Sequence, residues 1–286
     1  MPSYIPRVLL FAAAAVVLSA EPRRIVSTAP SITETVFALG AGDRLVGVTN
    51  YCHYPPETAK ITKIGTYLEP HTETILALKP DLVISEDSPI HSKDLFSTLG
   101  LKVLKVRFET VADIYASIRA IASALGVQPR GEALVTSIES QLNAIRKSVA
   151  GRPPVSVMFL VGRTPNALEG MVATGNAPFM NEVIQIAGGR NVFRDGAMRY
   201  FRVSQEQIIA RNPEVILDMG DMADTAGVTE AHKREVVSLW NNMPALQAVA
   251  RHRVYAIASD IYVVPGPRVV DCARAFARMF HPEAVR

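Results

Sequence analysis

Histidine is the side chain in this 286-residue sequence that could most readily provide metal-ligand or acid–base chemistry. No two histidines have the i, i+4 spacing that places two imidazoles on one helix face. His53 and His71 lie in predicted loops and could approach one metal ion together with Asp260, which keeps a bare zinc or manganese site open as an alternative. The complete set of histidines is 53, 71, 91, 232, 252 and 281. This spacing favours a protein without a resident metal.

The short motifs of common enzymes are missing from the sequence. There is no Gly-x-Ser-x-Gly elbow, no His-Glu-x-x-His, no Gly-x-x-x-x-Gly-Lys phosphate loop, and no Gly-x-Gly-x-x-Gly after a strand. Thirty basic against 27 acidic residues leave a net charge of +3, which does not favour nucleic acid as a partner. Two cysteines exclude a fold built on disulfides. We therefore expect neither a hydrolase nor a nucleotide enzyme.

The first 20 residues read as an export segment. Arg7 precedes an unbroken apolar run over residues 8–18, and Ser19 and Ala20 follow it. Such a run is too short to span a hydrocarbon core of about 30 Å, so it predicts a cleaved signal peptide, with a retained anchor or a wrongly assigned start as the alternatives. No cysteine follows the run, which argues against lipid attachment there. We expect a soluble periplasmic protein.

Short strands and helices alternate along the next hundred residues. Strand-like runs at residues 24–27, 46–48, 82–84 and 101–106 are separated by helical patterns, among them residues 73–78 and 111–125. Ser31 and Glu34 have the spacing of a capping box at the start of the first helix, and Gly40 marks its end. This order predicts α/β structure with parallel-type sheets and helices on their faces.

An internal repeat indicates two halves of one design. Residues 73–84 match residues 206–217 without a gap, 133 positions apart, with the same Glu, Ile, Ala and Pro at four places. Ser204 and Gln207 form a capping box before the second copy, and residues 34–40 resemble residues 182–188 more weakly. We predict two α/β sandwich lobes, although helix, proline and buried strand can recur in any α/β protein.

One long amphipathic helix is predicted between the halves. Leu134, Ile138, Leu142 and Ile145 keep helical spacing within residues 131–147. A helix is a stiff connection, so the lobes should move little and should enclose a cleft suited to a small molecule. The predicted boundaries are a signal peptide at 1–20, an N-terminal lobe at 21–127, a connecting helix at 128–151 and a C-terminal lobe at 152–286.

Several segments resemble one family of transport proteins. The chain is similar to the helical-backbone class (class III) of periplasmic substrate-binding proteins, which serve ABC importers for cobalamin, haem and ferric siderophores. The resemblance covers nearly all of residues 24–286, and residues 50–56 are most similar to the cobalamin-binding branch. It rests on residues 24–34, 46–56, 77–84, 240–249, 253–255 and 265–268. The resemblance implies a monomeric, non-enzymatic receptor without a covalent cofactor, which binds a corrinoid or an iron chelate and delivers it to an inner-membrane permease dimer.

The resemblance also implies a ligand site on both sides of the cleft. A tyrosine at the Tyr51 position contacts the ligand in the cobalamin branch, and a loop matching residues 260–264 faces it from the other lobe. Where that branch has tryptophan walls, this chain has tyrosine or glutamate, which leaves haem or a ferric siderophore open as the ligand. The expected ligand-contacting residues are Tyr51, Tyr67, Glu86, Tyr200, Asp260, Ile261, Tyr262, Val263 and Val264.

The alternative ligands would use other side chains. Iron in haem could be held by Tyr67, His71 or His53, whereas a siderophore could be held by arginines. The candidate arginines are Arg163, Arg199, Arg202 and Arg268. A further alternative from another class is an enzyme or a chelatase-like assembly factor on a related two-lobed scaffold.

Two glutamates and two cysteines complete the expectations. Glu73 and Glu206 are equivalent in the repeat, and in the family such a pair meets arginines of the permease dimer; a glutamate is also favoured at a helix start by the helix dipole. Cys52 and Cys272 lie in different lobes, so no disulfide is expected between them. Cys272 should pack as a small apolar residue, and Cys52 should line the pocket.

Overall fold

The computed structural model describes residues 21–87, 95–220, 229–257 and 259–284. The predicted signal peptide lies outside these residues. Within the described residues, no helix is long and apolar enough to cross a membrane.

The N-terminal lobe is built on a fully parallel five-stranded sheet with the strand order β3-β2-β1-β4-β5. Every residue of β1 is buried, as expected for a central strand covered on both faces. The strands are β1 (Ile25–Ser27), β2 (Leu45–Val48), β3 (Thr62–Lys63), β4 (Leu82–Glu86) and β5 (Val103–Val106). The helices are α1 (Pro30–Ala38), α2 (Thr72–Ala77), α3 (Leu95–Thr98) and α4 (Val111–Ala124), with 3₁₀ turns at Gly42–Arg44 and Pro56–Lys60.

The C-terminal lobe has a mixed sheet with the order β11-β10-β6-β7-β9, and β8 also pairs with β6. The centre is parallel, while β7 runs antiparallel to both β6 and β9. The strands are β6 (Val155–Gly162), β7 (Val172–Thr174), β8 (Gly189–Asn191), β9 (Tyr200–Arg202), β10 (Val215–Asp218) and β11 (Val254–Ala256). The helices are α6 (Pro178–Ile186), α7 (Gln205–Arg211), α8 (Glu230–Leu239), α9 (Gln247–Ala250) and α10 (Val269–Phe280), with 3₁₀ turns at Trp240–Asn242 and Asp260–Tyr262. The predicted two-lobed α/β fold is confirmed.

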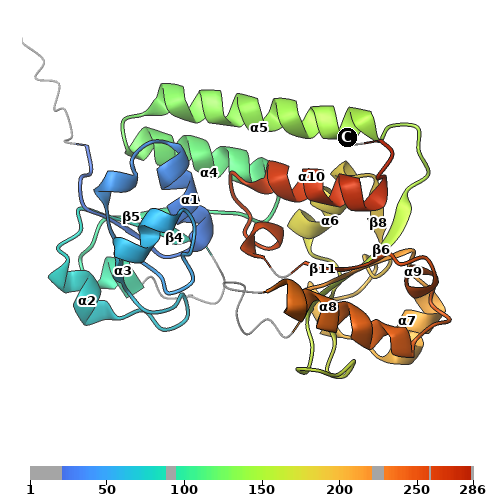
Figure 1. Ribbon diagram of the computed structural model, residues 1–286. Coiled ribbons are helices and arrows are strands. Elements are labelled where there is room, and N and C mark those ends of the chain that lie inside the picture. The colour runs from blue at the N-terminus through green and yellow to red at the C-terminus, as the bar shows by residue number, and fades with distance from the viewer. Residues whose placement is uncertain (1–20, 88–94, 221–228, 258, 285–286) are drawn as a thin grey trace, which may run out of the picture.

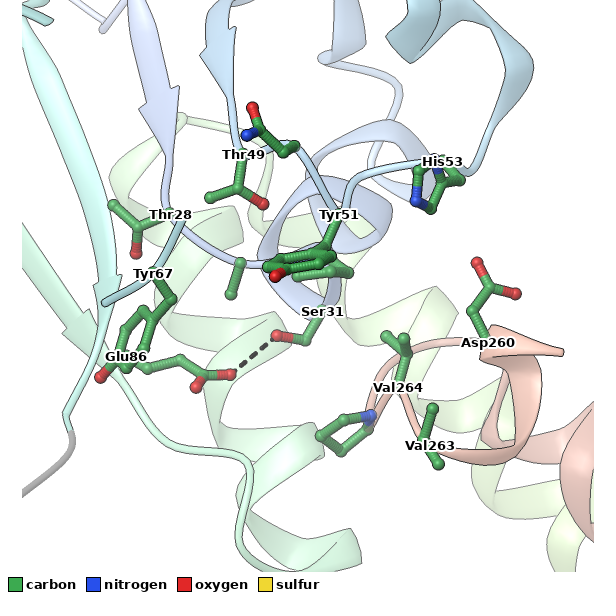
Figure 2. A pocket seen from close by; sticks show the side chains of 14 residues that line it. Thr28, Ser31, Thr49, Tyr51, His53, Tyr67, Glu86, Asp260, Val263 and Val264 are labelled. Carbon is green, nitrogen blue, oxygen red and sulfur yellow. Dashed lines mark hydrogen bonds between the residues drawn. The ribbon is translucent and has the colours of Figure 1, made fainter. Parts of the chain in front are cut away.

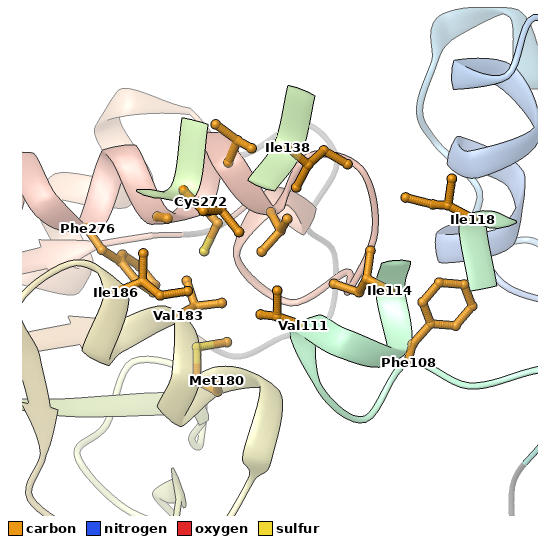
Figure 3. Close-up of a cluster of buried hydrophobic side chains, with 14 of the residues drawn as sticks. Phe108, Val111, Ile114, Ile118, Ile138, Met180, Val183, Ile186, Cys272 and Phe276 are labelled. Carbon is orange, nitrogen blue, oxygen red and sulfur yellow. The ribbon is translucent and has the colours of Figure 1, made fainter. Parts of the chain in front are cut away.

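Helix α5 (Gln128–Ser148) runs along the top of both lobes in Figure 1, and α10 lies beneath its C-terminal half. The apolar stripe of α5, which includes Val135 and Leu142, is buried. One continuous hydrophobic cluster joins the lobes: Ile114 of α4, Ile138 of α5 and Val183 of α6 belong to it (Figure 3). The connection is therefore a shared core in addition to the single helix, which strengthens the expectation of small lobe motion.

The internal repeat recurs in the backbone. Lys79 and Asn212, 133 positions apart, both follow their helices in the left-handed region, with φ of 46° and 40°. Ile75 and Ile208 are also equivalent, and both are buried against their lobes. The two copies therefore share their local conformation as well as their residue pattern.

The acid that follows the proline of each copy has the same structural role. Asp81 accepts hydrogen bonds from the backbone amides of Arg23 and Arg24, next to β1. Glu214 accepts from the backbone amide and hydroxyl of Ser156, in β6. Each carboxylate thus binds the start of the neighbouring central strand, which explains an acid at this position of both copies.

The predicted capping box at the first helix is wrong. Helix α1 begins at Pro30, whose missing N–H needs no partner, and Ala29 is its N-cap without a side-chain hydrogen bond. Ser31 and Glu34 are buried within the helix and bind residues far away in sequence. The capping box of Ser204 and Gln207 is confirmed.

Candidate functional site

A cavity of about 570 Å³ lies between the lobes, with a size typical of small-molecule sites. Most of its described lining comes from the N-terminal lobe, and four residues near the end of the chain, Asp260 and the consecutive Val263, Val264 and Pro265, close the other side (Figure 2). The described lining residues are Thr28, Ala29, Pro30, Ser31, Thr49, Asn50, Tyr51, His53, Tyr67, Glu86, Asp260, Val263, Val264 and Pro265.

Sheet topology explains why these residues meet. Residues 28–31 follow β1, residues 49–53 follow β2, and Glu86 ends β4, so all three groups lie at the carboxyl ends of adjacent parallel strands. This edge is where open α/β sheets bind ligands, because the loops that leave the strands diverge there. The cavity is thus a consequence of strand order, which sequence spacing does not reveal.

Tyr51 is the most prominent aromatic side chain of the cavity. It projects from the loop after β2 with 60% of its surface exposed, and Figure 2 shows it between Thr49 and His53 on one side and Val264 on the other. An exposed aromatic ring beside aliphatic side chains offers a flat apolar contact with a polar tip. The arrangement suits a ligand with a broad apolar face.

Glu86 supplies a partly buried carboxyl group to the lining of the cavity. The Ser31 hydroxyl donates a hydrogen bond of 3.0 Å to Glu86 Oε1 (Figure 2). Burial raises the pKa of Glu86 above its ordinary value of 4.5; the hydrogen bond from Ser31 opposes this rise, and the charge of Glu109 adds to it. The carboxyl is therefore easier to protonate than an exposed glutamate and can accept or donate a hydrogen bond.

An ion-pair network crosses from lobe to lobe beside the cavity. Arg268, at the start of α10, donates through Nε to Glu34 Oε2 at 2.8 Å and through Nη2 to Glu34 Oε1. Asp260 Oδ2 lies 3.2 Å from Arg268 Nη2, and the Tyr54 ring centre lies 4.0 Å from the guanidinium carbon. Burial lowers the pKa of Arg268, but the hydrogen bonds and charges of Glu34 and Asp260 outweigh it and raise the pKa overall. Arg268 is fully engaged by these groups.

Six of the nine expected ligand contacts line the cavity, and three do not. Tyr200 is 53% exposed on β9, and Ile261 is likewise outside the described lining. Tyr262 stacks on Phe276 of the shared core, with ring centres 5.5 Å apart, because the 3₁₀ turn at Asp260–Tyr262 directs it inward. The six lining residues are Tyr51, Tyr67, Glu86, Asp260, Val263 and Val264.

The expected position of Cys52 is wrong. Its side chain is buried in the N-terminal core, where its sulfur lies 3.2 Å from the hydroxyl oxygens of both Thr33 and Thr49. Burial raises the pKa of Cys52, and the threonine hydrogen bonds oppose the rise. Cys272 is buried in the shared core, as expected. Both are free thiols.

The arginines considered for a siderophore are mostly committed elsewhere. Arg163 is buried against Asp218, Arg199 pairs with Glu109, and Arg268 belongs to the interlobe network. Arg202 is exposed and lies outside the described lining. Among the described residues, no group of three or more His, Cys, Asp or Glu side chains could hold a metal ion.

Sequence reasoning missed the small polar residues of the lining. Thr28, Thr49 and Asn50 each follow a buried strand. A small polar residue directly after such a strand was the sequence signal that could have identified them as lining residues. It becomes informative once β1 and β2 are known to be neighbours, because both loops then lie at one sheet edge.

The sequence and the fold are similar to those of known proteins. A family model described as periplasmic binding protein matches residues 25–261. This chain belongs to the periplasmic binding protein family. The resemblance to substrate-binding proteins of ABC importers is thereby confirmed. An uncharacterised ABC-transporter substrate-binding lipoprotein of Bacillus subtilis is 30% identical over 279 residues, which cover 95% of this chain and 84% of the relative.

Two other relatives are informative about the class. A vitamin B12-binding protein of Vibrio cholerae is 28% identical over 87% of this chain and 85% of its own length. The solved structure of a periplasmic haem-binding protein from Roseiflexus sp. RS-1 in its apo form is 29% identical, with a TM-score of 0.77, and the match covers 92% of this chain and 99% of that one. The family thus includes similar proteins with different ligands.

Proposed function

We propose that the protein captures a corrinoid in the interlobe cavity and passes it unaltered to an ABC permease. The observation that carries the choice of ligand is the charge of the cavity. Its described lining contains two carboxyl groups, Glu86 and Asp260, and no lysine or arginine. Haem propionates and many ferric siderophores carry negative charge, and the described lining offers them no cationic partner, because Arg268 beside the cavity is already paired with Glu34 and Asp260. A corrinoid presents peripheral amides and a cobalt centre that carries positive charge, which carboxylates accommodate.

The side chains provide contacts for the rest of such a ligand. Tyr51 and Val264 offer apolar surface to a macrocycle, while Ser31, Thr49 and Asn50 can exchange hydrogen bonds with amides. The vitamin B12-binding relative supports the same ligand.

Haem is the second candidate ligand, and one observation favours it. Tyr51, Tyr67 and His53 all line the cavity, and phenolate and imidazole groups are side chains that bind haem iron. The haem-binding structural relative supports this alternative.

Titration of the purified protein discriminates between these ligands. Aquocobalamin, haemin and a ferric siderophore are added separately, and binding is followed by absorbance and by calorimetry. We expect aquocobalamin to bind one to one and to be recovered chemically unchanged. Tighter haemin binding with a shifted Soret band would replace the corrinoid assignment, and turnover of any bound tetrapyrrole would replace the receptor with an enzyme.

A charge-removing variant sharpens the ligand experiment. In Glu86→Gln with Asp260→Asn, the carboxylates are replaced by neutral groups of similar size, so haemin should gain affinity relative to aquocobalamin. The matched control is Glu69→Gln, an exposed glutamate outside the described lining. An unchanged affinity ratio in the double variant would show that cavity charge does not select the ligand.

Export and docking belong to the same proposal. We infer that residues 1–20 are removed, that the mature chain acts as a monomer in the periplasm, and that Glu73 and Glu206 contact basic residues of the permease. Both glutamates are exposed, at the starts of α2 and α7, on the side of the molecule away from α5 (Figure 1). The variant Glu73→Ala with Glu206→Ala should bind ligand normally but lose uptake in reconstituted vesicles; normal uptake would refute the docking assignment.

A further inference from the structure

Two large apolar side chains are exposed at equivalent positions of the internal repeat. Leu76 on α2 has 43% of its surface exposed, and Ile209 on α7 has 54% exposed. They are 133 positions apart, the same separation as Glu73 and Glu206. A single exposed aliphatic residue needs no explanation, but the same exposure at both copies of a repeat does.

Helix geometry places each apolar side chain beside a glutamate. Residues at i and i+3 share a helix face, so Leu76 lies next to Glu73 and Ile209 lies next to Glu206. The adjacent residues Ile75 and Ile208 are buried and hold the helices to their lobes. The outward face of each short helix therefore presents one carboxylate and one aliphatic group.

The two patches lie far apart on one side of the molecule. Figure 1 shows α2 at the outer end of the N-terminal lobe and α7 at the outer end of the C-terminal lobe, both on the side away from α5. The patches repeat the same chemistry on two similar lobes, which is the arrangement that a two-fold symmetric partner can contact twice.

We propose that Leu76 and Ile209 are a matched pair of apolar docking contacts for a two-fold symmetric permease. Each inserts into an apolar hollow of one permease subunit, beside the basic residue that binds the neighbouring glutamate. This proposal rests on the proposed function and adds contacts that charge pairing alone does not supply. The glutamates steer the approach and set the orientation, while the aliphatic groups, which lose water on contact, supply affinity that salt does not screen.

The test uses the permease–ATPase complex that takes up cyanocobalamin when the wild-type protein is present. This complex is reconstituted in lipid discs, and the binding of polar variants to it is compared with the binding of wild type. The variants are Leu76→Ser, Ile209→Ser and the double change, each loaded with cyanocobalamin. We expect docking to weaken about tenfold for each single change and about a hundredfold for both. Ligand titration should be unchanged, which shows that the variants are folded. The matched control is Met198→Ser, another exposed apolar residue of the C-terminal lobe that lies outside the matched segments.

Salt separates the apolar contacts from the glutamates. At 1 M salt the Debye length falls to about 3 Å, so the loss of docking affinity caused by Glu73→Ala with Glu206→Ala should shrink, whereas the loss of docking affinity caused by the serine double variant should persist.

If the glutamate variant impairs docking and the serine variant does not, the apolar proposal is wrong while the proposed function stands. If neither variant affects docking, both the apolar contacts and the docking glutamates are refuted. A wild-type dimer in solution that the serine variant dissociates would identify a second copy of this chain as the occupant and overturn the permease assignment.

Discussion

The strands that end the two copies of the repeat, β4 and β10, differ in their last residues. Glu86 ends β4 and faces the cavity, with a hydrogen bond from the Ser31 hydroxyl. Asp218, at the end of β10, is fully buried: its Oδ2 accepts from Arg163 Nε at 3.0 Å and from Trp240 Nε1 at 2.8 Å. Its Oδ1 accepts from the Gly220 amide at 2.8 Å.

This difference shows how one repeated framework yields a closed core at one strand end and an open cavity at the other. In the C-terminal lobe, the cation and the indole N–H are provided within the fold, so the carboxylate is satisfied and the strand end is closed. In the N-terminal lobe, a small serine leaves room beside the glutamate. The open strand end therefore retains hydrogen-bonding capacity for a ligand.

Breaking the buried network of the C-terminal lobe should have the largest effect. Asp218→Ala leaves the Arg163 guanidinium buried without its partner, and we expect a loss of about 3 to 5 kcal/mol in the free energy of unfolding. Chemical denaturation measures this loss of unfolding free energy. The variant Glu86→Ala, at the open strand end, is measured for comparison. A loss below about 1 kcal/mol for Asp218→Ala would contradict the contrast between closed and open ends.

Removing the interlobe guanidinium should have the next largest effect. Arg268→Gln leaves Glu34 and Asp260 close together without a cation, and we expect a loss of about 2 kcal/mol in unfolding free energy because the pair is only partly exposed. Thermal unfolding at neutral pH provides the measurement. Stability equal to wild type would show that the shared core alone holds the lobes together.

Tyr51 and Tyr200 offer a comparison between the lobes in ligand binding. Tyr51→Ala should weaken binding of the bound chelate at least tenfold, which corresponds to about 1.4 kcal/mol, because a flat contact is lost. Tyr200→Ala should change affinity much less, since Tyr200 lies outside the described lining. Calorimetric titration of both variants decides this, and equal losses would place β9 at the ligand.

The pH dependence of Glu86 should be the smallest effect. The pKa of Glu86 is raised in the folded state, so the folded protein binds this proton more tightly than the unfolded chain does. Stability contributed by the group is therefore present below pH 4.5 and is lost as pH rises from 4.5 through the folded pKa, with a slope of at most about 1.4 kcal/mol per pH unit. Denaturation from pH 4 to pH 8 should show this slope as the difference between wild type and Glu86→Gln; an absent difference would mean that Glu86 is not desolvated.

Local patterns in the sequence predicted several of the elements and the family. The repeat around Glu73 and Glu206, the long helix and the two lobes were predictable because periodicity, proline and capping residues act over a few positions. The same local reasoning failed for Ser31 and Glu34, whose capping pattern yields to distant partners, Glu86 and Arg268.

The site itself depended on the tertiary structure. The sequence determined two α/β halves and the long helix that connects them. Strand order placed residues 28–31, 49–53 and 86 at one sheet edge. The packing of whole elements buried Cys52, stacked Tyr262 on Phe276 and engaged Arg268 between the lobes. Contacts between residues tens to hundreds of positions apart depend on how complete elements pack, and no local pattern encodes that packing.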